Sequence, residues 1–70
     1  MENYLTIFIN GEPFNCDYSM SLRHVLVYLN FNIDTIIVEY NQQIIDKLSF
    51  DSLFFKNNDQ IEIITIVGGG

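Results

Sequence analysis

Apolar and polar residues alternate over residues 4–9, as they do in a strand that buries one face. Asn10-Gly11 follows, a dipeptide typical of a type I′ turn because both of its residues accept positive φ values. The pattern therefore predicts a β-hairpin with a two-residue loop. One face of this hairpin carries only apolar side chains, those of Leu5, Ile7, Phe14 and Cys16. The opposite face carries Thr6, Phe8, Pro13 and Asn15.

The next apolar residues recur at the spacing of a helix. They stand at positions i, i+3, i+4 and i+7 and are Leu22, Val25, Leu26 and Leu29. Ser21 is a suitable N-cap for this helix, and the run Asn30-Phe31-Asn32 ends the pattern. Because a helix of about nine residues is marginal alone in water, we expect its apolar stripe to pack on a sheet.

The rest of the chain predicts two more strands. Residues 35–40 are rich in β-branched side chains, and a polar turn at 41–43 separates them from a short apolar piece at 44–45. A second turn at 57–59 precedes the last strand, which we expect at residues 60–67. The two faces of that strand carry Ile61 with Ile63, and Glu62 with Ile64.

Residues 46–55 follow neither a helix nor a strand period, so we expect an irregular segment there. The side chains expected to anchor it are Leu48, Leu53, Phe54 and Phe55. The element order predicts an α+β fold, a mixed sheet of four or five strands packed on one main helix. We expect the last strand to lie centrally beside the first. Residues 1–67 are expected to form this domain, and residues 68–70 a flexible glycine tail.

Length and charge narrow the function. A chain of 70 residues is large enough for one core but too small to wall a substrate pocket as well. Its three basic residues stand singly against nine acidic ones, which argues against nucleic-acid binding and favours a basic protein partner. No apolar run reaches the length of a membrane span, and the N-terminus has no basic signal region. We expect a monomer in the absence of partners.

The chain shows little sign of its own catalytic chemistry. His24, the one histidine, is expected to be solvated on the helix surface. Cys16 alternates with Phe14 on the inner face of the hairpin, so we expect a small buried apolar residue rather than a reactive thiol. No glycine-rich phosphate loop is present, since Gly11 is the one glycine before the tail. If ATP takes part in the function, a partner must bind it.

The sequence finishes on an apolar run and three glycines, Gly68, Gly69 and Gly70. Extended, three residues reach roughly 10 Å, and without Cβ atoms they can enter a narrow channel. The Gly70 carboxylate is inert to acyl substitution until its oxygen becomes a leaving group, which adenylation provides. A sulfur nucleophile can then give a thiocarboxylate. The apolar side chains expected away from the inner face form a candidate partner-contact patch, which consists of Phe8, Ile64, Ile66 and Val67.

The chain resembles the ThiS family, the ubiquitin-like β-grasp sulfur carriers of thiamine thiazole biosynthesis. The resemblance covers nearly the whole length and rests on five features. They are the hairpin 5–16 with Asn10-Gly11, the helix 21–29, the block 37–45, the turn Asn58-Asp59 before 61–64, and the Val67-Gly68-Gly69-Gly70 ending. The terminal glycines are shared by every ubiquitin-like carrier, so the block at 41–45 and the short length are the more specific signals. We expect residues 41–43 to act as a turn rather than as a contact.

This resemblance implies a protein co-substrate and not an enzyme. A ThiF-like enzyme using Mg-ATP adenylates Gly70, and sulfur arrives indirectly from a cysteine desulfurase. Thiazole synthase (ThiG) then takes the sulfur, with Gly68 and Gly69 inserted into the partner active sites. The chain itself binds no cofactor or metal. Its lack of alanine and its many Asn, Ile, Phe and Tyr residues suggest an AT-rich genome, hence the cytoplasm or, if organelle-encoded, the plastid stroma.

Three other functions stay open at this level. The small subunit of molybdopterin synthase resembles the chain in fold and tail, but that family usually has a proline before its glycines, where this chain has Ile66-Val67. A ubiquitin-like modifier conjugated to lysines is the second alternative. The third is a plain interaction module whose tail is idle.

Overall fold

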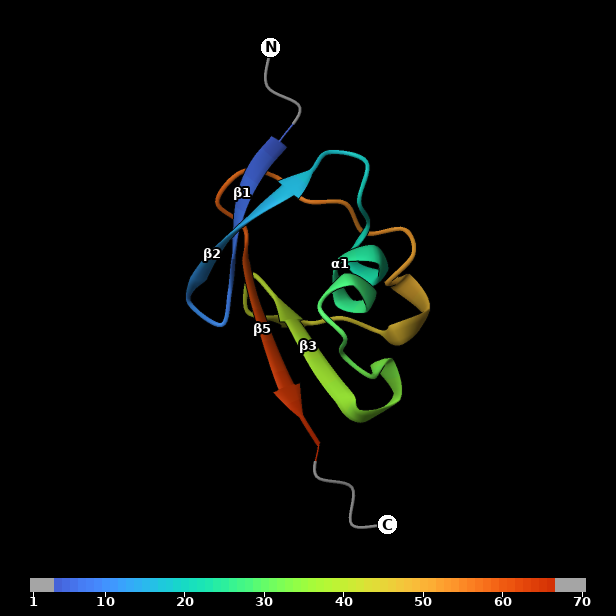
Figure 1. Ribbon diagram of the computed structural model, residues 1–70. Coiled ribbons are helices and arrows are strands. Elements are labelled where there is room, and N and C mark those ends of the chain that lie inside the picture. The colour runs from blue at the N-terminus through green and yellow to red at the C-terminus, as the bar shows by residue number, and fades with distance from the viewer. Residues whose placement is uncertain (1–3, 67–70) are drawn as a thin grey trace.

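The computed structural model describes residues 4–66 and has a five-stranded mixed sheet with one α-helix on one of its faces (Figure 1). The elements are β1 (Tyr4–Ile9), β2 (Glu12–Asp17), α1 (Leu22–Tyr28), β3 (Ile36–Tyr40), β4 (Gln43–Ile44) and β5 (Gln60–Thr65), with 3₁₀ turns η1 (Ile33–Thr35) and η2 (Lys47–Ser49). The strand order is β2-β1-β5-β3-β4. β5 is parallel to β1 and antiparallel to β3, so the predicted α+β fold with a central last strand is confirmed.

The opening hairpin has the predicted register. Leu5 pairs with Cys16 and Ile7 with Phe14, which requires a two-residue loop. Asn10 and Gly11 have φ values of 52° and 85°, the left-handed geometry that this turn needs. Three members of the predicted inner face, Leu5, Ile7 and Cys16, are buried, and Phe14 packs against them.

Asn10 has a second role that the turn pattern does not reveal. β1 ends at Ile9, so β5 continues past it without a backbone partner on that side. The side-chain oxygen of Asn10 fills this position and accepts a hydrogen bond of 2.7 Å from the Ile63 N–H. Its own N–H donates to the Ile61 carbonyl at 2.8 Å. One residue therefore closes the hairpin and extends the pairing of the central strand.

The predicted helix is confirmed, and both of its ends are capped. The Ser21 hydroxyl accepts from the His24 N–H, and His24 Nδ1 accepts in return from the Ser21 N–H, which gives a capping box with histidine in place of the usual Glu or Gln. At the other end, Asn30 has φ 66°, and the Asn30 and Phe31 N–H groups donate to Val27 and Leu26. This pattern is a Schellman motif. The stripe residues Leu22, Val25 and Leu26 are buried, as expected.

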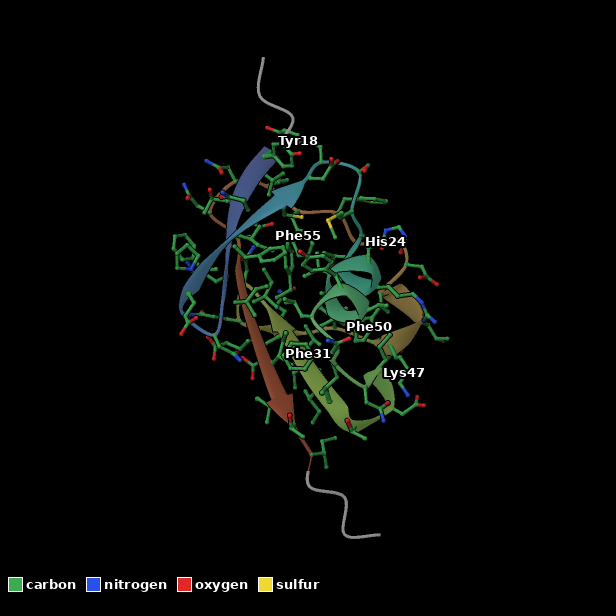
Figure 2. The ribbon with its side chains drawn as sticks, in the orientation of Figure 1. Tyr18, His24, Phe31, Lys47, Phe50 and Phe55 are labelled. Carbon is green, nitrogen blue, oxygen red and sulfur yellow. The ribbon has the colours of Figure 1, made fainter. Side chains whose placement is uncertain are left out.

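The segment at 46–55 is where the predicted anchors are partly wrong. Leu48 is 89% exposed and Phe54 is 52% exposed, whereas Phe50, which was not expected to anchor the segment, is only 2% exposed (Figure 2). Leu48 lies in the middle of η2, where its side chain faces solvent. The residues after η2 then pass beside the first turn of α1. There the Phe50 carbonyl accepts from the Arg23 N–H at 3.0 Å. The Leu53 carbonyl accepts from the Leu22 N–H at 2.8 Å, so this segment also caps the helix.

The turn between β3 and β4 is one residue shorter than expected. It consists of Asn41 and Gln42, with φ values of 47° and 73°, while Gln43 already belongs to β4. β3 itself begins at Ile36 rather than at residue 35, because residues 33–35 form η1. The last strand ends within the described residues at Thr65, and the expected boundary after residue 67 lies outside them.

The double role of Asn10 predicts that its replacements differ in a specific way. Asn10→Gly keeps the positive φ but leaves the Ile63 N–H without its acceptor, which should lower the free energy of unfolding by about 1–3 kcal/mol. Asn10→Asp keeps an acceptor oxygen and should retain most of the stability. Urea denaturation of the two variants measures the difference. Equal stability of the glycine and aspartate variants would contradict this role.

Candidate functional site

β5 leads directly toward the predicted tail. The Ile66 N–H donates to the Thr35 carbonyl at 2.7 Å, so pairing with the β3 side continues to the last described residue. Gly68, Gly69, Gly70 and Val67, which were predicted to carry or border the chemistry, lie outside the described residues. What the structure places is therefore the base of the tail and the surface around it.

The outer face of the sheet is the face opposite α1, and near the end of β5 it is apolar. Ile64 and Ile66 are 48% and 46% exposed, while Ile61 and Ile63 alternate with them and are buried. Ile37 on β3 pairs directly with Ile64 and is 37% exposed. Sequence reasoning missed Ile37. Its position between the buried Ile36 and Val38 was the signal that could have placed it on this face.

Phe8 lies apart from this apolar area. It is on the outer face of β1, but its register partners are Pro13 on β2 and Gln60 on β5. Ile64 lies four residues further along β5 than Gln60, which is about 13 Å at the rise of a strand. The structure therefore brings Ile64 together with Ile37 and does not bring Phe8 beside it. The partner-contact role of the predicted patch stays a prediction.

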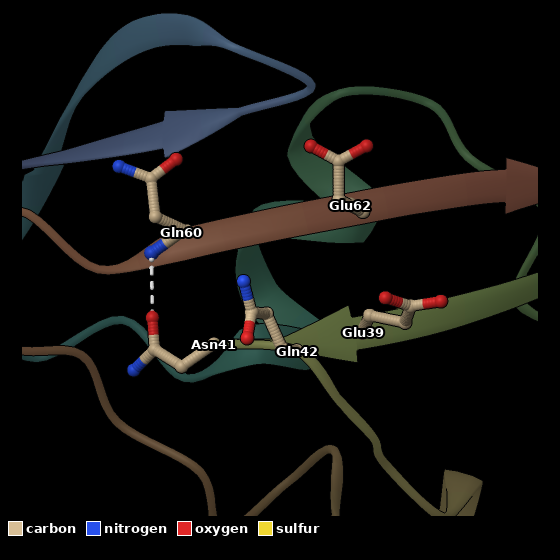
Figure 3. A pocket seen from close by; sticks show the side chains of 5 residues that line it. All are labelled: Glu39, Asn41, Gln42, Gln60 and Glu62. Carbon is tan, nitrogen blue, oxygen red and sulfur yellow. Dashed lines mark hydrogen bonds between the residues drawn. The ribbon is translucent and has the colours of Figure 1, made fainter.

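A shallow hollow of about 620 Å³ occupies the outer face next to the isoleucines (Figure 3). Its lining residues are Glu39, Asn41, Gln42, Gln60 and Glu62. All of them except Glu39 are exposed, so the hollow is a surface feature and not an enclosed cavity. Glu39 and Glu62 stand directly opposite each other on β3 and β5. The hollow is therefore acidic, and it has no aromatic or aliphatic lining of the kind that holds small-molecule ligands.

A buried carboxylate fixes the turn that borders this hollow. Asp59 accepts hydrogen bonds from the Tyr40 hydroxyl at 2.5 Å, from Asn41 Nδ2 at 3.2 Å and from the Lys56 N–H at 2.7 Å. Asn41 also accepts from the Gln60 N–H through its side chain and donates to the Gln60 carbonyl through its backbone. The turn at Asn41–Gln42 is thereby fastened to the start of β5, in agreement with the expected turn role.

The two residues with potential chemistry of their own have structural roles. His24 is exposed and closes the capping box of α1. Cys16 is fully buried, and its thiol donates to the Asp17 carbonyl at 3.3 Å. Burial, with a smaller effect from the charge of Asp17, raises the pKa of the Cys16 thiol above its ordinary value. A buried thiol that resists ionisation is a poor nucleophile, as expected from its position in the hairpin.

Comparison with known proteins gives consistent matches over almost the entire chain. The ThiS family matches residues 7–70. The ycf40 protein of Porphyra purpurea is 47% identical over 66 residues, covering 94% of this chain and 93% of that protein. The crystal structure of the thiamine biosynthesis protein ThiS from Geobacter metallireducens superposes with a TM-score of 0.78 at 26% identity, covering 94% of this chain and all of that one.

A third kind of relative is much longer. The thiazole synthase of Magnetococcus marinus is 30% identical over 66 residues, and the match covers 94% of this chain but only 20% of that protein. No helix among residues 4–66 is long and apolar enough to cross a membrane.

The Tyr40–Asp59 hydrogen bond predicts a pH dependence of stability. Burial first, and then the hydrogen bond to Asp59 and its charge, raise the pKa of Tyr40 to about 12, against about 10 in an unfolded chain. The contribution is fully present below about pH 10. It is lost as the pH rises from 10 to 12, because the unfolded state releases its proton first.

Urea unfolding between pH 8 and 11.5 measures this loss. Tyr40→Phe should be less stable at pH 8 by about 1–3 kcal/mol and should lose less stability as the pH rises. Tyr18→Phe, which changes an exposed ring, is the matched control and should follow the wild type. An equal slope in the Tyr40→Phe variant and the wild type would rule out the proposed origin of the pH dependence.

Proposed function

The chain belongs to the ThiS family, and from this premise we propose that it is a sulfur carrier of thiamine biosynthesis whose Gly70 carboxylate accepts and delivers the sulfur atom. The main support for this function is that the family match includes the three glycines. The central strand of the sheet precedes them in the sequence. The similarity to a ThiS crystal structure supports the same function. Among the alternatives left open by the sequence, neither a molybdopterin synthase subunit nor a protein modifier gains support from these matches.

The reaction needs a partner enzyme to activate the carboxylate. In the first step a Gly70 oxygen attacks the α-phosphorus of ATP, pyrophosphate leaves, and an acyl-adenylate forms. In the second step a persulfide sulfur attacks the acyl carbon and displaces AMP, which gives an acyl disulfide. A thiol then reduces the S–S bond, which releases the C-terminal thiocarboxylate and leaves the thiol oxidised to a disulfide. The ThiF-like adenylating enzyme binds Mg-ATP, and the sulfur derives from a cysteine desulfurase. A thiazole synthase of the ThiG type receives the sulfur.

The chain contributes presentation rather than catalysis. Family members are small sulfur carriers, and the described residues of this chain form a packed sheet and helix that hold the base of the tail. Gly68 and Gly69 serve as the unhindered approach that enters the partner active sites. Cys16 takes no part as a sulfur relay, because its thiol is buried beneath the hairpin. ycf40 is a name of plastid-encoded genes, which supports the plastid stroma as the location.

The reacting atom can be tested by intact mass spectrometry. The chain is incubated with the adenylating enzyme, Mg-ATP, a cysteine desulfurase, cysteine and a thiol reductant. We expect a species heavier by the difference between one sulfur and one oxygen atom, with the added mass on the C-terminal fragment. Deletion of Gly70 should reduce this species below detection.

Leu48→Ser is the matched control for this experiment. Leu48 is almost fully exposed on η2, so its replacement should leave the sulfur loading unchanged. If the mass change persists at the wild-type level after Gly70 is deleted, Gly70 is not the reacting residue and the proposal is wrong.

A further inference from the structure

The outer face of β3 and β5 contains an arrangement that stability alone does not explain. Glu39 and Glu62 lie directly opposite each other in the register, where like charges destabilise a sheet. Within residues 4–66 the salt bridges join Arg23 to Asp51 and Lys47 to Asp34, and none includes either glutamate. These two carboxylates therefore repel each other across the strands without a cation of the described chain beside them.

The next pair on the outer face of the same two strands is apolar and exposed. Ile37 and Ile64 lie opposite each other, one pair closer to the tail, and Ile66 follows at the end of the strand. Toward the tail, the outer residues of β5 are therefore polar (Gln60), acidic (Glu62) and apolar (Ile64), and the apolar Ile66 follows the strand. α1 packs on the other face of the sheet, so no element of residues 4–66 covers this strip (Figure 1).

Position decides which kind of molecule covers the strip. Ile66 is the last described residue before the tail, so an enzyme that takes the tail must lie against the surface at its base. A cation between two carboxylates removes their repulsion and gains two charge-assisted hydrogen bonds. The net charge of −6 favours the approach of a basic protein surface, and Glu39 and Glu62 place part of that negative charge on this face. Proteins named thiazole synthase contain a segment similar to nearly all of this chain, which favours that enzyme as the occupant.

We propose that the outer strip of β3 and β5 docks on thiazole synthase, which places a lysine or arginine between Glu39 and Glu62 and an apolar surface against Ile37, Ile64 and Ile66. This inference rests on the proposed sulfur-carrier function and identifies the chemistry of the partner surface. The spacing is specific. Glu62 lies four residues before Ile66, so the cation should lie about 13 Å from the point where the tail enters the enzyme.

Binding kinetics between the full chain and purified thiazole synthase from the same organism test the docking. For the wild type, the association rate should fall as NaCl is raised from 20 to 500 mM. The double variant Glu39→Gln/Glu62→Gln should associate roughly 3–10-fold more slowly at low salt and show a flatter salt dependence. Its Tm should equal or exceed that of the wild type, because the repulsion between the strands is removed. Ile64→Asn should mainly speed dissociation.

The matched control neutralises two carboxylates elsewhere on the surface. Glu12→Gln/Asp51→Asn changes the net charge by the same amount, and Glu12 and Asp51 lie on β2 and in the loop beside α1. If the Glu39–Glu62 pair itself is recognised, this control should bind within about twofold of the wild type, because it changes only the net charge, which has the smaller effect. Docking by this strip is overturned if both double variants bind alike, or if the wild type does not bind thiazole synthase.

Failure of the docking proposal can be distinguished from failure of the carrier function. The mass experiment with the adenylating enzyme does not involve thiazole synthase. A chain that gains sulfur at Gly70 but binds thiazole synthase independently of Glu39 and Glu62 refutes the docking proposal alone. A chain that gains no sulfur refutes the carrier function.

Discussion

The structure depends on the central position of β5, which is held from both sides. On one side it pairs with β3 along its whole length, and the Ile66 N–H bond to Thr35 continues this pairing to the last described residue. On the other side β1 reaches only the first part of the strand, where the Phe8 N–H donates to the Asp59 carbonyl. Asn10 then supplies the missing partner for Ile63. The strand that precedes the tail is thus paired on both of its sides.

The two faces of this central strand differ in what they contact: one face packs in the core and the other is exposed. Its inner residues, Ile61 and Ile63, complete the core with the hairpin and α1. A chain of this size needs all of that burial for stability and has none to spare for a catalytic pocket. Its outer residues Glu62 and Ile64 are exposed, which leaves them available to a partner.

Elements with a strong local pattern were predictable from the sequence. Asn10-Gly11 fixes the hairpin register, and the stripe on α1 fixes the buried face of the helix. The burial of Phe50 in place of Leu48 was not predictable, because it follows from carbonyls that cap α1 from a segment without a period. The side-chain contacts of His24, Asn10 and Asp59 depend on tertiary position. The alternation along β3 could have placed Ile37 on the outer face, but its position opposite Ile64 depends on the strand register.

Amide hydrogen exchange, followed residue by residue by NMR, tests the central claim most directly. If β5 is held from both sides, the Ile63 N–H should exchange as slowly as a β3 amide that faces β5, such as that of Ile37, although its acceptor is a side chain. The Ile66 N–H, which donates to Thr35, should exchange far more slowly than the amide of Gln42 in the exposed turn between β3 and β4. Exchange of Ile63 and Ile66 at the rate of exposed turn amides would contradict the account.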